Sequence, residues 1–278
     1  MTAASIALLE DRGVIAVTGE DAGKFLDNLI TNDMGLIEHD GAIFAALLSP
    51  QGKILFDFFV VVAAEGYFLD VAKDQVARLI QRLTLYKLRA KIAIAEVRNV
   101  NVYVDWSAPA RPRGFRDPRS TELGQRMLSS GGVEHTGDQN DYHAHRISLG
   151  VPEGGKDYEF GDAFPHEALI DRLNGVSFTK GCYVGQEIVA RMEHRGTARR
   201  RIVRVSGERE LPAMGTDVLA GEVTIGTMGS HAGDIGLAML RLDRVAEFAA
   251  KGIALTAGGV SITPDRGDVA RLMPRVAE

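Results

Sequence analysis

Apolar positions in the first hundred residues follow two different periods, which together predict a sheet with helices packed on it. Continuous or alternating apolar runs are typical of strands, and here they cover 14–17, 43–48, 54–62 and 67–71. The turn-forming segment Ser49–Lys53 joins the second and third runs, so this pair is predicted to be a hairpin. Between 22 and 30, and again between 73 and 85, apolar residues recur every three or four positions, which indicates amphipathic helices. The N-terminal part is therefore expected to be an α+β layer.

In the middle of the chain the apolar positions follow a less regular period than in the first hundred residues. Residues 107–141 combine prolines, arginines, serines and glycines around a short helical piece near 123–128, and we interpret them as a surface connection. Residues 142–149 predict a strand, and Pro165 predicts the start of a helix that would place Glu167 in its first turn. A further helix is expected from Gln186 to Met192.

Short apolar runs separated by glycine and proline dominate the chain beyond Arg201 and predict a small β-barrel. The last residues, from Arg271 to Glu278, are expected to be a mobile tail.

Composition and charge narrow the class of protein. The 278 residues are 45% hydrophobic and 25% charged, which is ordinary for a globular protein with a large core. A net charge of −5 gives no general attraction to nucleic acid or to membrane surfaces. One cysteine excludes an internal disulfide, and the first residues lack a secretion signal. We therefore expect a cytoplasmic protein that does not span a membrane.

The segment Lys180–Glu187 has the highest concentration of different functional groups in the chain, because the single cysteine, an ammonium, an amide and a carboxylate occur within eight positions. One interpretation is a structural turn around a small buried thiol. The other is a reactive or metal-binding thiolate, since Cys182 would lie just before a helix N-terminus and near Lys180. A lone cysteine cannot hold a metal cluster by itself, so any such role needs ligands from a partner.

The motif Lys-Gly-Cys-Tyr-x-Gly-Gln-Glu, with Gly175–Phe178 before it and Val189–Arg191 after it, resembles the signature of the YgfZ-type folate-binding proteins. The opening segment Thr18–Asp33 also resembles the aminomethyltransferase-like family, to which these proteins are related. The resemblance implies an α+β fold: an aminomethyltransferase-like body of two interlocked subdomains over 1–198, the inner one near 43–141, and a C-terminal β-barrel over 199–278.

The implied function is a tetrahydrofolate-binding accessory role in iron-sulfur cluster assembly or repair. Through client cluster enzymes it would support tRNA modification. The implied cofactor is tetrahydrofolate or a one-carbon derivative, with a transient cluster shared with a partner. The implied partners are cluster assembly proteins or client enzymes.

The same resemblance implies a set of site residues. Reactive roles fall to Cys182, Lys180 and Asp57, and Lys180 with Arg191 would hold the thiolate charge. The motif loop is completed by Gly181, Tyr183, Gly185, Gln186, Glu187 and Arg191. Folate contacts are implied at Arg12, Tyr142 and Glu167, although related proteins carry tryptophan at the first two places.

Two other functions remain open at this point. An aminomethyltransferase that moves a one-carbon unit to tetrahydrofolate would carry two adjacent aspartates where this chain has Phe56 and Asp57, and it would carry a Gly-Tyr-Thr-Gly-Glu segment that is missing here. Direct RNA binding would depend on the arginines between Arg191 and Arg204. A folate tail, an RNA phosphate or an acidic protein surface would each suit those arginines.

Overall fold

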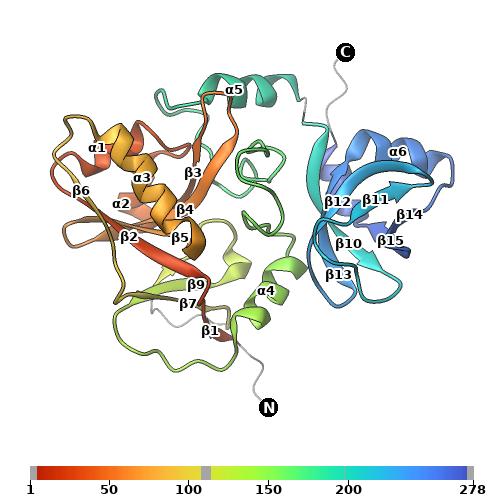
Figure 1. Cartoon of the computed structure of the whole chain (residues 1–278), viewed down its shortest axis with the longest axis horizontal. Helices are drawn as coiled ribbons and strands as arrows, with labels where there is room; N and C mark the ends of the chain where they lie inside the picture. Colours follow the sequence, from red (N-terminus) through yellow and green to blue (C-terminus); the bar gives the residue numbers. More distant parts are fainter. Residues whose placement is uncertain (1–4, 108–113, 197, 274–278) are drawn as a thin grey trace. The chain divides into compact units, whose positions relative to one another are not determined.

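The computed structural model describes residues 5–107, 114–196 and 198–273, which form two compact units. The first unit holds the chain up to Tyr142 together with Ile170–Gln186. The second holds His143–Leu169 together with the chain from Glu187 onward. Each unit is thus built from two separate segments, which can be followed by colour in Figure 1.

A five-stranded antiparallel sheet forms the centre of the first unit, with the order β3-β4-β5-β2-β6. The predicted hairpin is confirmed, because Ala46 pairs with Asp57 and Leu47 with Phe56 across the turn that begins at Ser49. The strands are β2 (Arg12–Thr18), β3 (Ala42–Leu48), β4 (Ile54–Ala63), β5 (Gly66–Ala72) and β6 (Ala93–Glu96).

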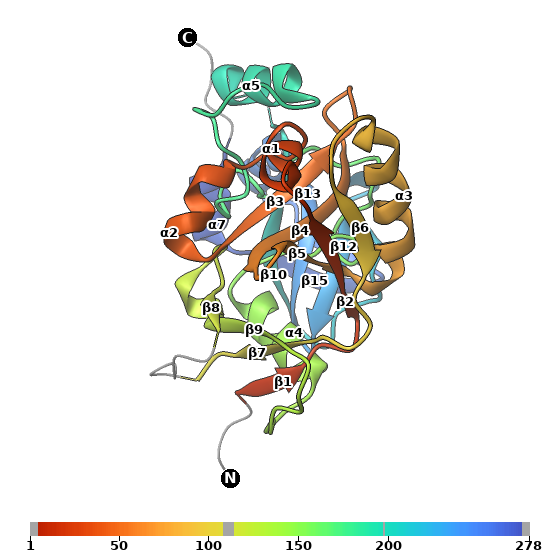
Figure 2. The same cartoon turned by 90° about the vertical axis from the view of Figure 1, so that its left-hand side faces the viewer.

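Helices cover one face of this sheet, and both predicted amphipathic helices are confirmed. In α3 (Val76–Lys87) the residues Val76, Leu79 and Leu83 are buried, and the helix packs beside β6 and β2 (Figure 2). Each such side chain contributes about 1.5–3 kcal/mol to folding through removal of apolar surface from water. The other helical pieces here are α1 (Ala22–Asp27), α2 (Ile37–Asp40) and the 3-10 turns η1 (Met34–Leu36) and η2 (Lys73–Gln75).

A second sheet of the first unit has the order β1-β7-β9-β8. Its strands are β1 (Ile6–Leu8), β7 (Asn101–Asp105), β8 (Phe115–Arg116) and β9 (Gln125–Ser129), with the 3-10 turn η3 (Thr121–Leu123) between the last two. The prediction of a helical piece at 123–128 within a surface connection is therefore wrong for this stretch. Arg119 and Arg126 are buried here, which the sequence pattern conceals because arginine usually indicates a surface.

The predicted strand at 142–149 is also wrong, since α4 (Gln139–Ser148) covers most of it. Asp138 explains the helix, because its carboxylate accepts hydrogen bonds from the backbone N–H groups of Asn140 and Asp141 (2.7 and 3.1 Å). The predicted helix from Pro165 is absent as well. The chain forms successive turns there, and Leu169 has a φ of 61°, which interrupts a right-handed helix.

The predicted barrel is confirmed in the second unit as a closed six-stranded sheet with the order β10-β13-β12-β11-β14-β15, visible toward the blue end of the chain in Figure 1. Its strands are β10 (Arg200–Gly207), β11 (Asp217–Ala220), β12 (Val223–Ala232), β13 (Ile235–Arg241), β14 (Leu255–Ala257) and β15 (Val260–Pro264).

Three helices accompany the barrel: α5 (Gln186–Arg195), which confirms the helix expected after the motif, α6 (Leu242–Ala250) and α7 (Arg266–Leu272). The predicted mobile tail begins too early, because α7 extends to Leu272; residues 274–278 lie outside the described residues. Among the described helices, none has the length and apolar character that crossing a membrane requires.

Candidate functional site

A buried ammonium holds the start of the cysteine motif in the first unit. The side chain of Lys180 is 2% exposed, and its Nζ donates to the carbonyl oxygens of Asp27 (2.6 Å), Ile30 (3.1 Å) and Asn32 (2.7 Å). It also lies 3.0 Å from the Asp27 carboxylate. Asp27 is the last residue of α1, and Ile30 and Asn32 follow it, so these carbonyls lie at or just beyond a helix end, where backbone oxygens lack helical partners. An ammonium has three N–H donors, so Lys180 is fully used in fastening the loop and leaves none for a thiolate. The thiolate-holding role expected for Lys180 is not what this geometry provides.

Thr31 and Asn32 form a second attachment, and the sequence interpretation did not assign them to the site. The Thr31 hydroxyl donates to the carbonyl of Gly175 (2.6 Å) and accepts from the N–H of Ala46 (2.9 Å). The Asn32 amide donates to the carbonyls of Asn174 (2.7 Å) and Phe44 (2.8 Å). Both side chains are buried, so the segment that leads into the motif is fixed against β3.

Gly185 fixes the far end of the motif. Its φ is +83°, and a Cβ placed there would lie 2.6 Å from the carbonyl oxygen of Ser49 in the β3–β4 turn. Only glycine allows both this conformation and this close approach. Nearby, Tyr183 is 7% exposed, and burial raises the pKa of its hydroxyl to about 12. Its ring centroid lies 5.6 Å from the ammonium of Lys180.

Cys182 lies between these two attachments and is exposed. A Cβ added at the neighbouring Gly181 would find no atom within 4 Å, so the chain beside the thiol faces open space. The interpretation of Cys182 as a small buried group is therefore wrong. Gln186 opens α5, and Glu187 and Arg191 are exposed on that helix. The motif presents one accessible thiol on a loop that is tied down on either side.

Asp57 lies on β4 and is buried, like Phe56 before it. Alternation along the strand places the two on opposite faces of the sheet, and Phe56 belongs to the core cluster with Phe58. Asp57 shares its face with Phe59. The first unit thus holds one buried carboxylate at this position of the hairpin, beside a phenylalanine that is committed to the core.

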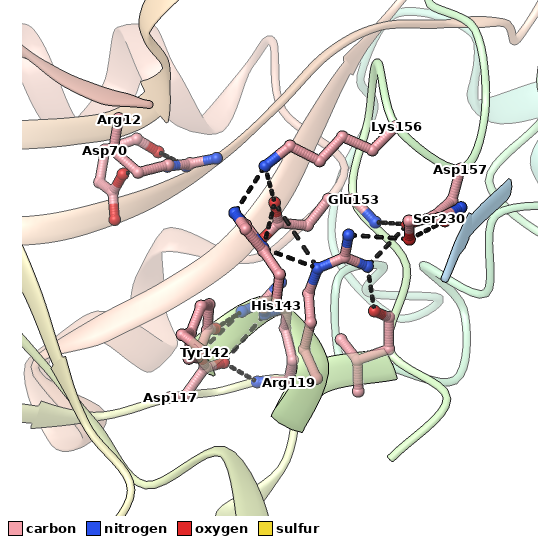
Figure 3. A network of polar contacts seen from close by, with 12 residues as sticks. Arg12, Asp70, Asp117, Arg119, Tyr142, His143, Glu153, Lys156, Asp157 and Ser230 are labelled. Atoms are coloured by element: carbon pink, nitrogen blue, oxygen red, sulfur yellow. Dashed lines mark hydrogen bonds and ion pairs between the residues drawn. The ribbon is translucent and has the colours of Figure 1, made fainter. Parts of the chain in front are cut away.

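An ionic network surrounds Asp70 in the first unit (Figure 3). One carboxylate oxygen of Asp70 accepts from Arg12 (2.6 Å), and the other accepts two bonds from Arg126 (3.0 and 2.7 Å). The exposed fractions of the Arg12 and Arg126 side chains are 6% and 1%. Because two guanidiniums share one buried carboxylate, this cluster organises the space between the two sheets of the unit.

Tyr142 and Arg119 extend the same network. Arg119 forms two bonds to Asp117 (3.0 and 2.8 Å) and donates to the Tyr142 hydroxyl (2.8 Å), which also accepts from Arg126 (3.3 Å). Burial by itself would raise the pKa of Asp117, but the guanidiniums of Arg119 and Arg126 outweigh it and hold that pKa below its ordinary value. Tyr142 is fully buried, so the tyrosine expected to stack on folate is engaged through its hydroxyl.

Glu167, in the second unit, is also engaged. Its carboxylate accepts from Arg200 at both oxygens (2.7 and 3.0 Å) and from the backbone N–H of Phe164 (3.0 Å). The hydrogen bonds that Arg200 donates to the Glu167 carboxylate raise the pKa of the Arg200 guanidinium. A carboxylate in this bidentate pair is not available as an acceptor for a pterin ring.

A separate cluster in the second unit joins α4 to the barrel (Figure 3). Asp157 accepts from Arg146 (2.7 Å) and from the N–H of Glu153 (2.9 Å) at one oxygen, and from the N–H of Ser230 (2.8 Å) at the other. Arg146 and Asp157 are buried, and Ser230 lies where the β12–β13 pairing shifts register. This cluster ties the 153–157 segment to β12, and sequence patterning gave no signal of it.

Comparison with known proteins first defines a class. The fold matches the crystal structure of glycine cleavage system aminomethyltransferase T from Bartonella henselae with a TM-score of 0.73 and 16% identity, covering 96% of this chain and 86% of that one. A family model described as CAF17, C-terminal beta-barrel domain, matches residues 199–272. The protein therefore has an aminomethyltransferase-like fold with a CAF17-type barrel, which confirms the predicted aminomethyltransferase-like α+β body followed by a C-terminal β-barrel.

Two relatives then define the family. The mitochondrial iron-sulfur cluster assembly factor IBA57 of Homo sapiens is 32% identical over 280 residues, which cover 85% of this chain and 77% of that protein. The Mus musculus protein of the same name is 31% identical over 277 residues, with the same coverage. The chain belongs to the IBA57 family of iron-sulfur cluster assembly factors. The predicted class of function is confirmed at this level, whereas the cytoplasmic location stays a prediction, because these relatives are named as mitochondrial.

Proposed function

We propose that this protein acts in iron-sulfur cluster assembly through Cys182, which meets the cluster or a cysteine of a partner protein. The observation that carries the proposal is the exposed thiol on a loop fixed by Lys180 on one side and by Gly185 on the other. An accessible thiol can form a bond to iron in its thiolate form. A loop that is already ordered loses little conformational freedom when that bond forms.

The cluster is cargo in this proposal, and it needs more than one protein. Iron-sulfur clusters are usually held by four cysteine thiolates, and this chain supplies one. A cluster assembly protein or a client enzyme would supply the others, so Cys182 acts at an interface. Lys180 has a positioning role, since its ammonium fastens the loop through backbone carbonyls.

Tetrahydrofolate binding is a finer proposal that the fold favours. The residues implied as contacts do not fit the ring directly: Glu167 is paired with Arg200, Arg12 with Asp70, and the Tyr142 hydroxyl accepts from two guanidiniums. We therefore assign no chemical step to folate. A supporting role for tRNA modification, through client cluster enzymes, and a cytoplasmic location are proposals that rest on the sequence resemblance alone.

Aminomethyl transfer is less well supported than cluster assembly. Phe56 occupies the place of one of the paired aspartates expected of that enzyme, and its ring is buried in the core cluster. A phenyl ring can neither accept a proton nor orient an amine by hydrogen bonding.

The test compares three forms of the protein in cells that lack it: wild type, Cys182→Ser, and a double variant, Cys182→Ser with Thr179→Cys. Thr179 is also exposed, so the double variant restores an accessible thiol at another place in the loop. We expect wild type to restore cluster-enzyme activity and both variants to fail. Full rescue by Cys182→Ser would refute the proposed function, and rescue by the double variant alone would show that any nearby thiol suffices.

A further inference from the structure

The second unit has a groove of about 500 Å³ beside α5, the start of β10 and the turn that contains Phe164. Ile188, Met192 and Ala198 line it together with Phe164, so part of its surface is apolar. Arginines 191, 195 and 199 also line it, and all three are exposed. The groove therefore combines an apolar lining with a concentration of positive charge.

The spacing along α5 explains how one helix supplies both kinds of surface. Ile188, Arg191, Met192 and Arg195 are three or four residues apart, so they lie on one face. Val189, which is fully buried, lies on another face of the helix. The groove-lining face of α5 is therefore distinct from its most buried position.

The arginines of the groove differ in how they are neutralised. Arg200 is paired with Glu167 and lies near Asp162, so its charge is satisfied within the unit. Arg199 is close enough to Asp243 to help lower the pKa of that carboxyl, whose main partner is the hydrogen-bonded Arg241. Within residues 5–107, 114–196 and 198–273, no carboxylate forms an ion pair with Arg191 or Arg195. Glu193, on the same helix, is instead hydrogen-bonded to His166 (3.1 Å). The positive charges of Arg191 and Arg195 are therefore not neutralised by an ion pair in the described part of the chain, and both side chains lie beside the apolar lining of the groove.

We propose that this groove docks an acidic segment of a partner protein, with an apolar side chain against Met192 and Ile188 and carboxylates directed to Arg191, Arg195 and Arg199. The inference rests on the proposed function for the kind of partner, since a cluster must be shared with another protein. A groove of about 500 Å³ is large enough to accept one or two side chains of a peptide. Exposed arginines on its rim would speed association and select partners by charge.

The arrangement favours an acidic peptide over RNA. A nucleic-acid backbone needs a continuous basic track, whereas Glu167, Asp162 and Glu193 lie among these arginines. The net charge of −5 also opposes a long polyanion more than a short peptide that feels only the local field.

The test measures fluorescence anisotropy with a labelled twelve-residue peptide of aspartate and glutamate around one central phenylalanine. The variant is Arg191→Glu with Arg195→Glu, and the matched control is Arg82→Glu with Arg89→Glu, which changes the same charge at exposed positions in the first unit. We expect the groove variant to bind the peptide about tenfold more weakly or worse and the control to bind within about twofold of wild type, because rim charges act locally. Replacing the phenylalanine of the peptide by serine should also weaken binding.

The docking proposal would be overturned by unchanged peptide binding in the groove variant, by equal weakening in the control variant, by no effect of the phenylalanine, or by tighter binding of an RNA hairpin than of the peptide. Unchanged thermal midpoints verify that the variants fold. Cys182→Ser should bind the peptide as wild type does. If Cys182→Ser binds the peptide but fails to restore cluster-enzyme activity in cells, the role of the thiol is supported independently of docking. If the Arg191→Glu, Arg195→Glu variant restores that activity fully, docking is refuted and the proposed role of Cys182 is unaffected.

Discussion

The ammonium of Lys180 lies 2.6 Å from the carbonyl oxygen of Asp27, so a residue of the cysteine motif closes the end of a helix that begins near residue 22. The two positions are separated by 153 residues of sequence. This bond joins the returning segment of the first unit to its opening helix, and it assigns Lys180 to the architecture that displays the thiol.

Lys180→Met should destabilise the first unit by about 2–4 kcal/mol, because it leaves the carbonyl oxygens of Asp27, Ile30 and Asn32 without their ammonium donor. Lys24→Met, at an exposed position of α1, serves as the control and should change stability by less than about 0.5 kcal/mol. Chemical denaturation measures both. Equal stability of the two variants would show that the ammonium is not needed to hold the loop.

Gly185→Ala and Gly181→Ala form a matched pair within the same motif. Alanine at 185 would have to adopt a φ of +83° and approach Ser49, so we expect a loss of at least about 2 kcal/mol. Alanine at 181 meets open space and should be tolerated. Thermal unfolding of the two variants distinguishes them, and similar midpoints would contradict the close contact with the β3–β4 turn.

Cys182 should react with iodoacetamide in the folded protein, since it is exposed, and the rate should rise with pH because the thiolate is the nucleophile. Cys182→Ser should leave the thermal midpoint unchanged, because no buried contact is lost. A time course read by mass spectrometry, in buffer and in denaturant, measures the protection. Alkylation that requires denaturant would mean that the thiol is shielded.

Asp117 should make stability fall in acid. Its pKa in the folded protein lies below its ordinary value of 3.8, so its contribution is complete above about pH 4 and is lost as the pH falls through the lowered value. Asp117→Asn removes this contribution and should flatten the corresponding part of the stability profile. Denaturation between pH 2 and 7 measures it; an unchanged slope in the variant would assign the acid sensitivity to other groups.

Glu167→Gln should leave tetrahydrofolate affinity within about twofold, since the native carboxylate is already bound by Arg200 and cannot also hold a pterin. Anaerobic calorimetry with tetrahydrofolate measures this. A loss of affinity above tenfold, at an unchanged thermal midpoint, would return Glu167 to the role that the sequence resemblance implies.

Segments with a regular apolar period were predictable because burial of their apolar residues determines their structure. The hairpin of β3 and β4, the face of α3 and the barrel strands all follow burial alone. The errors fall where polar groups decide the structure. The carboxylate of Asp138 caps α4, and the Asp117 and Asp70 carboxylates allow Arg119 and Arg126 to enter the interior, so an arginine-rich segment became part of a sheet.

The residue types of the cysteine motif identified it in the sequence, whereas the residues that hold the motif in place could not be identified in that way. Thr31, Asn32 and Asp27 act from more than 140 residues away in the chain, and a linear pattern carries no sign of such pairing. The role of Lys180 was misjudged for the same reason, because its nearness to Cys182 in sequence suggested an electrostatic partner.

The division of each unit into two chain segments has a consequence during synthesis. Ile170–Gln186 belongs to the first unit, and it leaves the ribosome only after the His143–Leu169 part of the second unit has been made. The sheet of the first unit can therefore assemble before its last segment arrives, and that segment carries Cys182. The loop that carries the thiol can therefore be added to a sheet that has already been made, while the barrel of the second unit is still to be synthesised.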